Sequence, residues 1–84
     1  MILAVDVGNS NTTVGLFDAA GRLSFLSALE TDKDKTKDRC AIDLLGVFGL
    51  YGAEIGSVDG AILSSVVPSL TATMTAAVGR LIGC

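Results

Sequence analysis

Residues 2–17 read ILAVDVGNSNTTVGLF, and this stretch decides how the fold begins. The apolar run Ile2–Val7 is typical of a buried strand. Gly8-Asn9-Ser10-Asn11 has the composition of a tight turn, because Gly and Asn tolerate positive φ angles and Asn and Ser bond to nearby backbone. Thr12–Phe17 returns to β-branched and aromatic residues, which favour a second strand. The stretch therefore predicts an antiparallel hairpin.

The segments that follow predict a third strand and a helix. Asp18–Gly21 has the composition of a second turn, and Arg22–Leu29 reads as a third strand, which completes an antiparallel meander. Thr36 is suited to cap the N-terminus of a helix that runs from Lys37 to about Tyr51. This apolar helix contains two glycines that indicate close packing against the sheet: Gly46 and Gly49.

A fourth strand and a last helix end the chain. Ala61–Val67 is apolar enough for a buried strand. Ser69 is expected to cap the last helix and Gly83 to end it, with an apolar stripe at positions 70, 74, 77, 78, 81 and 82. The predicted order is β-β-β-α-β-α, an α/β fold in which a right-handed crossover makes the fourth strand a parallel neighbour.

The apolar face of the last helix has no strand after it. In a two-layer α/β domain the next element is another parallel strand. We therefore expect a mixed sheet with its fifth strand missing, and residues 1–84 to form an incomplete lobe. The uncovered sheet edge predicts self-association.

The composition excludes several classes of site and partner. The 84 residues contain no His, which excludes Ser-His-Asp catalysis and imidazole–metal sites within the chain. With six Lys and Arg, a net charge of −3 and 5% aromatic residues, the chain has neither a basic surface nor a stacking platform. We expect no nucleic-acid partner.

Cysteine usage and hydropathy predict a cytoplasmic protein. Cys40 and Cys84 match no metal-site spacing; Cys40 is expected to be a buried, inert thiol, and Cys84 to be frayed. The N-terminus lacks the basic region of a signal peptide. Residues 60–79 carry no charge, but Pro68 and several Ser and Thr residues interrupt them, so we expect no membrane segment.

The first turn carries the residues with chemical potential. A tight hairpin directs backbone N–H groups into one concavity that suits an anion, and Gly8 permits close approach of an oxyanion. Short side chains beside Val7 and Gly8 can donate to phosphate oxygens: Asn9, Ser10, Asn11, Thr12 and Thr13. Asp6 repels phosphates unless a cation intervenes, which predicts Mg²⁺ held through its waters. A plain hairpin turn with no ligand is the alternative.

Two serines near the end of the fourth strand are lesser candidates. Ser64 and Ser65 lie close to the carboxyl edge of the sheet, where α/β sites gather. We expect their hydroxyls to bond to the backbone at the strand–helix junction instead.

The motif Asp6-Val7-Gly8-Asn9-Ser10-Asn11-Thr12-Thr13 resembles the first phosphate-binding motif of the acetate and sugar kinase, heat-shock 70 and actin superfamily. Two more segments resemble type III pantothenate kinases, a family earlier described as Bvg accessory factor-like transcriptional activators. They are Thr31-Asp32 with Lys35-Thr36-Lys37-Asp38, and the segment VDGAILSSVVPSL at residues 58–70. The resemblance runs in register over all 84 residues.

This resemblance implies the RNase H-like fold of the actin-like ATPase superfamily. It also implies ATP, Mg²⁺ at Asp6, a monovalent cation (K⁺ or NH₄⁺) outside this chain, and phosphorylation of pantothenate at the first step of coenzyme A synthesis by a homodimer. Only Asp6 to Thr13 carry over, as the ATP-binding hairpin. Some members have Lys where Thr13 stands, so no charged side chain is expected on the phosphates here.

The resemblance also implies that the catalytic Asp, in a Gly-x-Asp-Arg motif, lies beyond the equivalent of Cys84. The catalytic base is therefore unknown from these residues, and the chain alone is expected to be inactive. One alternative is a non-catalytic regulatory or assembly module that acts through a protein partner. Another is a kinase of the same superfamily with a different acceptor, because no residue of the chain identifies the acceptor.

Overall fold

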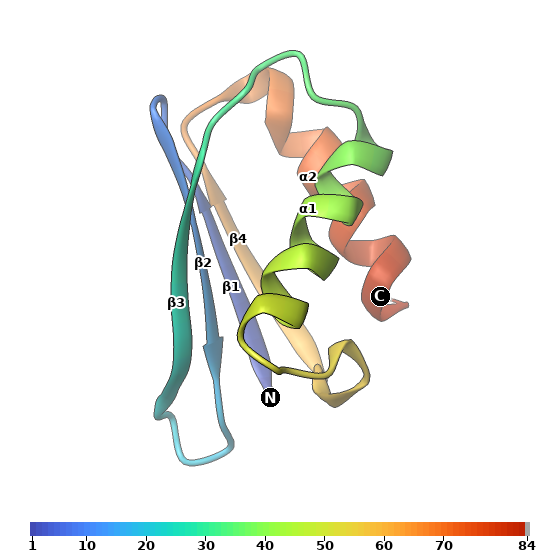
Figure 1. The fold of residues 1–84 in the computed structure, drawn as a ribbon. Helices are drawn as coiled ribbons and strands as arrows, with labels where there is room; N and C mark the ends of the chain where they lie inside the picture. The colour runs from blue at the N-terminus through green and yellow to red at the C-terminus, as the bar shows by residue number, and fades with distance from the viewer. Residues whose placement is uncertain (84) are drawn as a thin grey trace.

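The strands and helices follow one another in the predicted β-β-β-α-β-α order (Figure 1), in a computed structural model that describes residues 1–83. The expectation for Cys84 lies outside the described residues. The elements are β1 (Ile2–Val7), β2 (Asn11–Phe17), β3 (Leu23–Glu30), α1 (Lys37–Leu50), the short 3₁₀ helix η1 (Ile55–Ser57), β4 (Gly60–Ser65) and α2 (Pro68–Ile82). Neither α1 nor α2 has the length and apolarity needed to cross a membrane, so the described residues contain no membrane-spanning helix.

The four strands form one mixed sheet in the order β3-β2-β1-β4. β2 pairs antiparallel with β1 and with β3, as the meander predicts. β4 pairs in parallel with β1, and this confirms the predicted parallel neighbour. Because β3 and β4 lie at opposite edges, the connection through α1 crosses two strands. Within residues 1–83, β3 and β4 form the two edges of this sheet.

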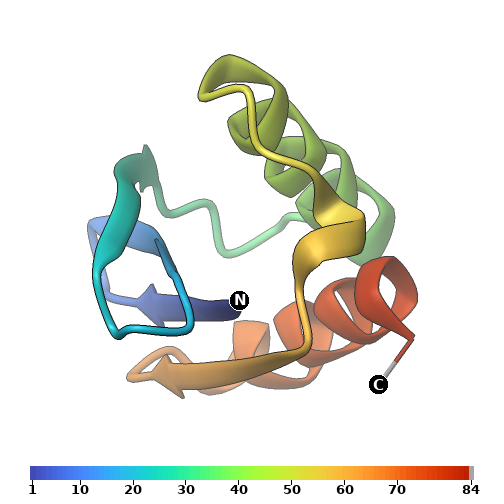
Figure 2. The same ribbon diagram turned by 90° about the horizontal axis from the view of Figure 1, so that it is seen from below.

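Both helices cover the same face of the sheet. Figure 2 shows α1 and α2 side by side, with η1 connecting α1 to β4. Along β1 the buried side chains are Leu3, Val5 and Val7, whereas Asp6 is exposed, because neighbouring residues of a strand point to opposite faces. The odd-numbered side chains of β1 therefore lie in the core, and its even-numbered side chains lie on a face that no helix covers in the described part of the chain.

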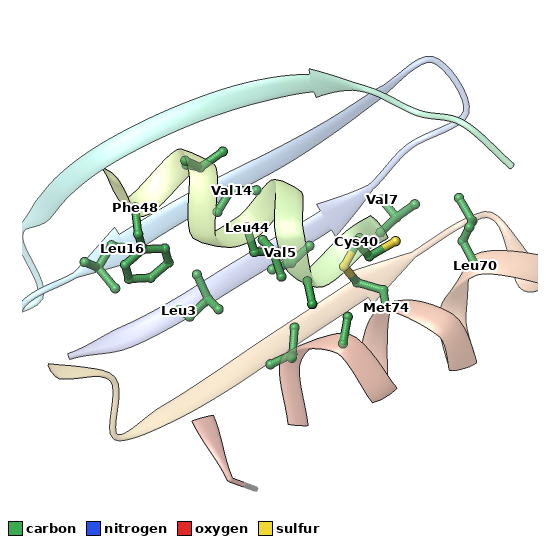
Figure 3. Packing of buried hydrophobic residues seen from close by; sticks show 14 of the residues in the cluster. Leu3, Val5, Val7, Val14, Leu16, Cys40, Leu44, Phe48, Leu70 and Met74 are labelled. Carbon is green, nitrogen blue, oxygen red and sulfur yellow. The ribbon is translucent and has the colours of Figure 1, made fainter. Parts of the chain in front are cut away.

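The core is a single apolar layer between the sheet and the helices (Figure 3). Phe48 of α1 is 1% exposed and packs edge-on against Phe25 of β3, with ring centroids 5.5 Å apart. Cys40 is 2% exposed, which confirms its predicted burial. This burial is the main reason that the pKa of the Cys40 thiol is raised, while Lys35 acts in the opposite direction. The thiol is therefore kept neutral, as a small apolar group.

The helix ends confirm two of three predicted caps. Thr36 caps α1, since its Oγ1 accepts from the Arg39 N–H at 3.2 Å. Gly83 ends α2 with a φ of 72°. The prediction for Ser69 is wrong: α2 begins at Pro68, and Val67 is its N-cap, without a side-chain bond. Proline is favoured in the first turn because its fixed φ suits a helix and its missing N–H would have no partner there.

The prediction that Gly46 and Gly49 let α1 pack closely on the sheet is also wrong. Both are exposed, and a Cβ added at either would have no atom within 4 Å. The helical period places Leu44, Val47 and Phe48 on the buried side, and it leaves the two glycines toward solvent.

Replacing Gly46 by Ala is therefore expected to raise the free energy of unfolding by about 0.5–1 kcal/mol, because Gly in a helix costs this much relative to Ala. Chemical denaturation monitored by circular dichroism measures the change. Gly52→Ala is the matched control. Gly52 has a φ of +67°, so this substitution should lower stability, although Gly52 also has open space around it. A loss of stability in Gly46→Ala would contradict the exposed position of Gly46.

Candidate functional site

A row of three polar side chains crosses the uncovered face of the sheet. The strand registers pair Asp6 with Thr13 of β2 and with Ser64 of β4. Directly paired residues point to the same face, and adjacent strands lie about 4.8 Å apart. All three residues line one shallow depression on this face, together with apolar side chains that include Ala4 and Ile62. The depression thus carries one carboxylate between two hydroxyls.

This row lies near the carboxyl ends of β1 and β4. These parallel strands end at the same edge of the sheet, and the β1–β2 turn and the start of α2 lie at that edge too (Figure 1). The Val66 N–H donates to the Val7 carbonyl at 3.0 Å, which holds the two strand ends together. In open α/β sheets, ligands gather at the carboxyl ends of the strands, so this edge is the candidate site.

The β1–β2 turn is tight, but it does not use left-handed backbone. In residues 1–83 positive φ angles occur only at Gly21, Gly52 and Gly83, so the expectation that the first turn exploits positive φ is wrong. Gly8 is needed for a different reason. Its N–H donates to the Asn11 carbonyl at 2.9 Å, and a Cβ at Gly8 would lie 2.9 Å from that same oxygen. The close approach of the Asn11 carbonyl within the turn, and not a ligand, therefore explains why position 8 needs a residue without a side chain.

The substitution Gly8→Ala is expected to lower the free energy of unfolding by about 1–3 kcal/mol, because the backbone of the turn must shift to make room. Thermal or denaturant unfolding measures this loss. Gly56→Ala is the control, since a Cβ at Gly56 in η1 meets nothing within 4 Å. Equal stability of the two variants would show that the turn relaxes freely.

The turn leaves some donors available to a ligand. The Gly8 N–H is already paired, whereas the N–H groups of Asn9 and Ser10 make no backbone hydrogen bond among the described residues. Asn9, Ser10 and Asn11 are exposed. The anion-binding capacity of the turn therefore rests on two amides and three short polar side chains, next to Asp6.

Two residues of the motif point into the core instead. Val7 is fully buried, and Thr12 is 5% exposed. The Thr12 and Thr31 hydroxyls lie 2.9 Å apart, which ties the hairpin to the segment after β3. The alternation along β2 thus separates neighbouring threonines, with Thr12 on the helix side and Thr13 on the uncovered side.

Two of the basic residues near the start of α1 form ion pairs with Asp43 of this helix. Lys35 Nζ lies 2.7 Å from Asp43, and Arg39 Nε lies 3.3 Å from it. In the described residues Asp6 has no ion-pair partner within 4 Å. No cationic side chain of these residues therefore offsets the charge of the Asp6 carboxylate, and the other two residues of the row, Thr13 and Ser64, carry no charge.

Comparison with known proteins identifies the family. The profile of the family described as type III pantothenate kinase matches residues 2–84. The chain belongs to this family. Similar relatives that bear the name type III pantothenate kinase come from Desulfotalea psychrophila (44% identical over 71 residues, 84% of this chain and 26% of the relative) and Pelobacter propionicus (42% over 76 residues, 90% and 30%). Another comes from Solibacter usitatus (43% over 74 residues, 88% and 28%).

These type III pantothenate kinases are much longer than this chain, which spans about a quarter to a third of their length. The match confirms the predicted family. The mixed four-stranded sheet with two helices confirms the predicted fold class, since its β-β-β-α-β-α order is consistent with half of an actin-like ATPase fold.

The donor set of this pantothenate kinase family member fits a hydrated magnesium ion better than a directly coordinated metal. Residues 1–83 contain no cluster of three or more His, Cys, Asp or Glu side chains that could enclose a metal. Mg²⁺ retains several waters and is commonly held by one or two carboxylates together with phosphate oxygens. One exposed carboxylate, flanked by hydroxyls and next to a turn with free amides, meets that need.

The two serines of β4 in this family member have different roles. The Ser65 hydroxyl accepts from the Val67 N–H and donates to the Val67 carbonyl, both at 3.1 Å, which confirms the predicted junction role. The same expectation is wrong for Ser64, whose side chain has no hydrogen bond in the described residues and lies beside Asp6. The sequence marked Ser64 only as a lesser candidate, because its position beside Asp6 depends on the pairing of β4 with β1.

Proposed function

We propose that this chain forms the ATP phosphate-binding part of a type III pantothenate kinase, which transfers the γ-phosphoryl group of ATP to a hydroxyl of pantothenate at the first step of coenzyme A synthesis. The observation that carries the proposal is the position of Asp6. It lies on the uncovered face at the carboxyl edge of the sheet, next to a turn with free amides, in a chain of this family. A plain structural turn needs no isolated carboxylate there.

Phosphoryl transfer depends mostly on positioning and on electrostatic stabilisation. Asp6 would hold Mg²⁺ through its waters, and the bound ion would neutralise charge on the phosphates. The Asn9 and Ser10 amides would donate to phosphate oxygens, and the polar side chains of the turn would add further donors. Thr13 would supply a hydroxyl beside Asp6.

The described residues supply no second acid in this hairpin that could act as a base for the acceptor hydroxyl. A hydroxyl nucleophile needs a positioned base, and Asp6 is engaged with the ion. We therefore propose that the base belongs to a part of the kinase outside these 84 residues, and that the chain alone does not phosphorylate pantothenate.

The test compares the purified 84-residue chain with a protein of the relatives' length that contains it, which we call the kinase-length protein. Both are assayed for ADP release with ATP, Mg²⁺ and pantothenate. Activity is expected only in the kinase-length protein. Phosphorylation by the 84-residue chain would overturn the division of roles, and a kinase-length protein that prefers another hydroxyl acceptor would overturn the substrate. A kinase-length protein that binds neither ATP nor pantothenate would favour the regulatory module.

By the same family membership we propose that the kinase-length protein needs K⁺ or NH₄⁺, forms a homodimer and works in the cytoplasm. Replacement of K⁺ by Na⁺ in the assay should lower turnover. Sedimentation should give the mass of two chains. Activity that is independent of the monovalent ion, or a monomeric mass, would contradict the corresponding part of the proposal.

A further inference from the structure

We propose that the Ser64 hydroxyl binds the hydrated Mg²⁺–phosphate group together with Asp6. This inference rests on the proposed function and adds a binding residue from β4, outside the hairpin motif. The site would then combine residues of β1 and β4. Asp6 and Ser64 lie 58 positions apart in sequence, but they are directly paired in the sheet.

The first observation is the position of Ser64 in the register. Parallel pairing places Asp6 opposite Ser64 and Ala4 opposite Ile62. The uncovered face is apolar at the row of Ala4 and Ile62, where Ile62 is 65% exposed, and it becomes polar one row nearer the carboxyl edge. Ser64 lies at this change, on the same side as the turn amides.

The second observation is that the Ser64 hydroxyl is not used by the fold. Ser65 bonds both polar groups of Val67, and Thr71 and Thr75 donate to carbonyls of the preceding turn. Ser64 is exposed and has no such bond among the described residues. Its hydroxyl can therefore turn toward a ligand without breaking an internal hydrogen bond.

The chemistry of a hydrated cation suits this arrangement. Waters bound to Mg²⁺ donate hydrogen bonds, and a serine oxygen accepts them while its O–H donates to a phosphate oxygen. Thr13 offers the same groups on the other side of Asp6. The described residues that line the depression include no Lys or Arg. The two hydroxyls would therefore contribute hydrogen bonds to the Mg²⁺–phosphate group, but no positive charge.

The experiment uses a pair of substitutions of nearly equal shape in the kinase-length protein. Ser64→Thr keeps the hydroxyl and Ser64→Val removes it, and both are β-branched residues that suit a strand. Isothermal titration calorimetry measures the Kd of ATP with Mg²⁺ and with the ion chelated. Ser64→Val is expected to weaken Mg²⁺–ATP binding about threefold to tenfold relative to Ser64→Thr, which corresponds to the loss of one hydrogen bond. Binding of ATP alone should change by less than about twofold, because this contact runs mainly through the hydrated ion.

Two further variants separate this inference from the proposed function. Asp6→Asn tests the ion site itself, and Ser24→Ala, which alters an exposed serine of β3 far from the row, is the matched control. If Asp6→Asn abolishes the Mg²⁺ dependence while Ser64→Val binds like Ser64→Thr, the role of Ser64 is overturned and the proposed function stands. If Asp6→Asn retains the full Mg²⁺ dependence, the ion site itself fails. Thermal unfolding of each variant shows whether a loss of affinity reflects a loss of fold.

Discussion

Replacing Asp6 by Asn should lower the kcat of the kinase-length protein by about 100- to 1,000-fold, because removal of one preorganised electrostatic group from a transfer site has effects of this size. Asn is nearly isosteric with Asp but carries no charge to hold a hydrated cation. The side chain is exposed and has no ion-pair partner among residues 1–83, so the fold should not depend on its charge. The measurement is the steady-state rate over a range of Mg²⁺ concentrations.

The control for this result is Asp34→Asn, which neutralises an exposed carboxylate in the loop before α1. It changes the net charge by the same amount at a distance from the row, and its rate should stay within about twofold of the parent rate, since exposed charges contribute little. Both variants should unfold at nearly the parent temperature. A normal rate in Asp6→Asn would remove the carboxylate from the mechanism, whereas unfolding of this variant would give Asp6 a structural role instead.

The largest effect on stability is expected from Phe48→Ala, with a loss of about 3–5 kcal/mol. Phe48 is 1% exposed, and its ring meets Phe25 of β3 edge-on, so truncation leaves a cavity between α1 and the sheet. A domain of this size has a total stability of about 4–13 kcal/mol, and the variant should therefore be partly unfolded at 37 °C. Denaturant unfolding of the purified chain gives the free energy directly.

Leu50→Ala is the matched control for Phe48→Ala. Leu50 lies in the last turn of the same helix, but it is 76% exposed. Its truncation should change the free energy of unfolding by less than about 0.5 kcal/mol. Similar losses in the two variants would mean that the side of α1 buried against the sheet has been assigned incorrectly.

The elements themselves were predictable because their signals are local. The apolar run of β1, the turn after it and the Thr36 cap each depend on a few neighbouring residues, and the structure has each of them where it was expected. The apolar stripe of α2 is likewise a local pattern, and Leu70 and Met74 are buried as it predicts. Boundaries moved by one or two residues, as for β4, which ends at Ser65 rather than Val67.

The features that could not be predicted depend on which residues pair or pack across space. Gly46 and Gly49 face solvent because the phase of α1 on the sheet is set by its contacts, which glycine content does not reveal. Ser69 does not cap α2 because Pro68 already starts the helix. Ser64 lies beside Asp6 only because β4 pairs with β1 in one particular register. The candidate site was thus predictable within the hairpin, but not across the sheet.

The strict alternation of side chains along β1 makes this strand intolerant of changes in length. An in-frame deletion of Val5 would exchange the faces of residues 2–4, because the β1–β2 turn fixes the register from Asp6 onward and a shift of one residue reverses the direction of each shifted side chain. Leu3 would then point toward water, and Ile2 and Ala4 toward α1 and α2. In a library of single-codon deletions, positions 4 and 5 should therefore be depleted far more strongly than the exposed turn at Ala19 and Ala20.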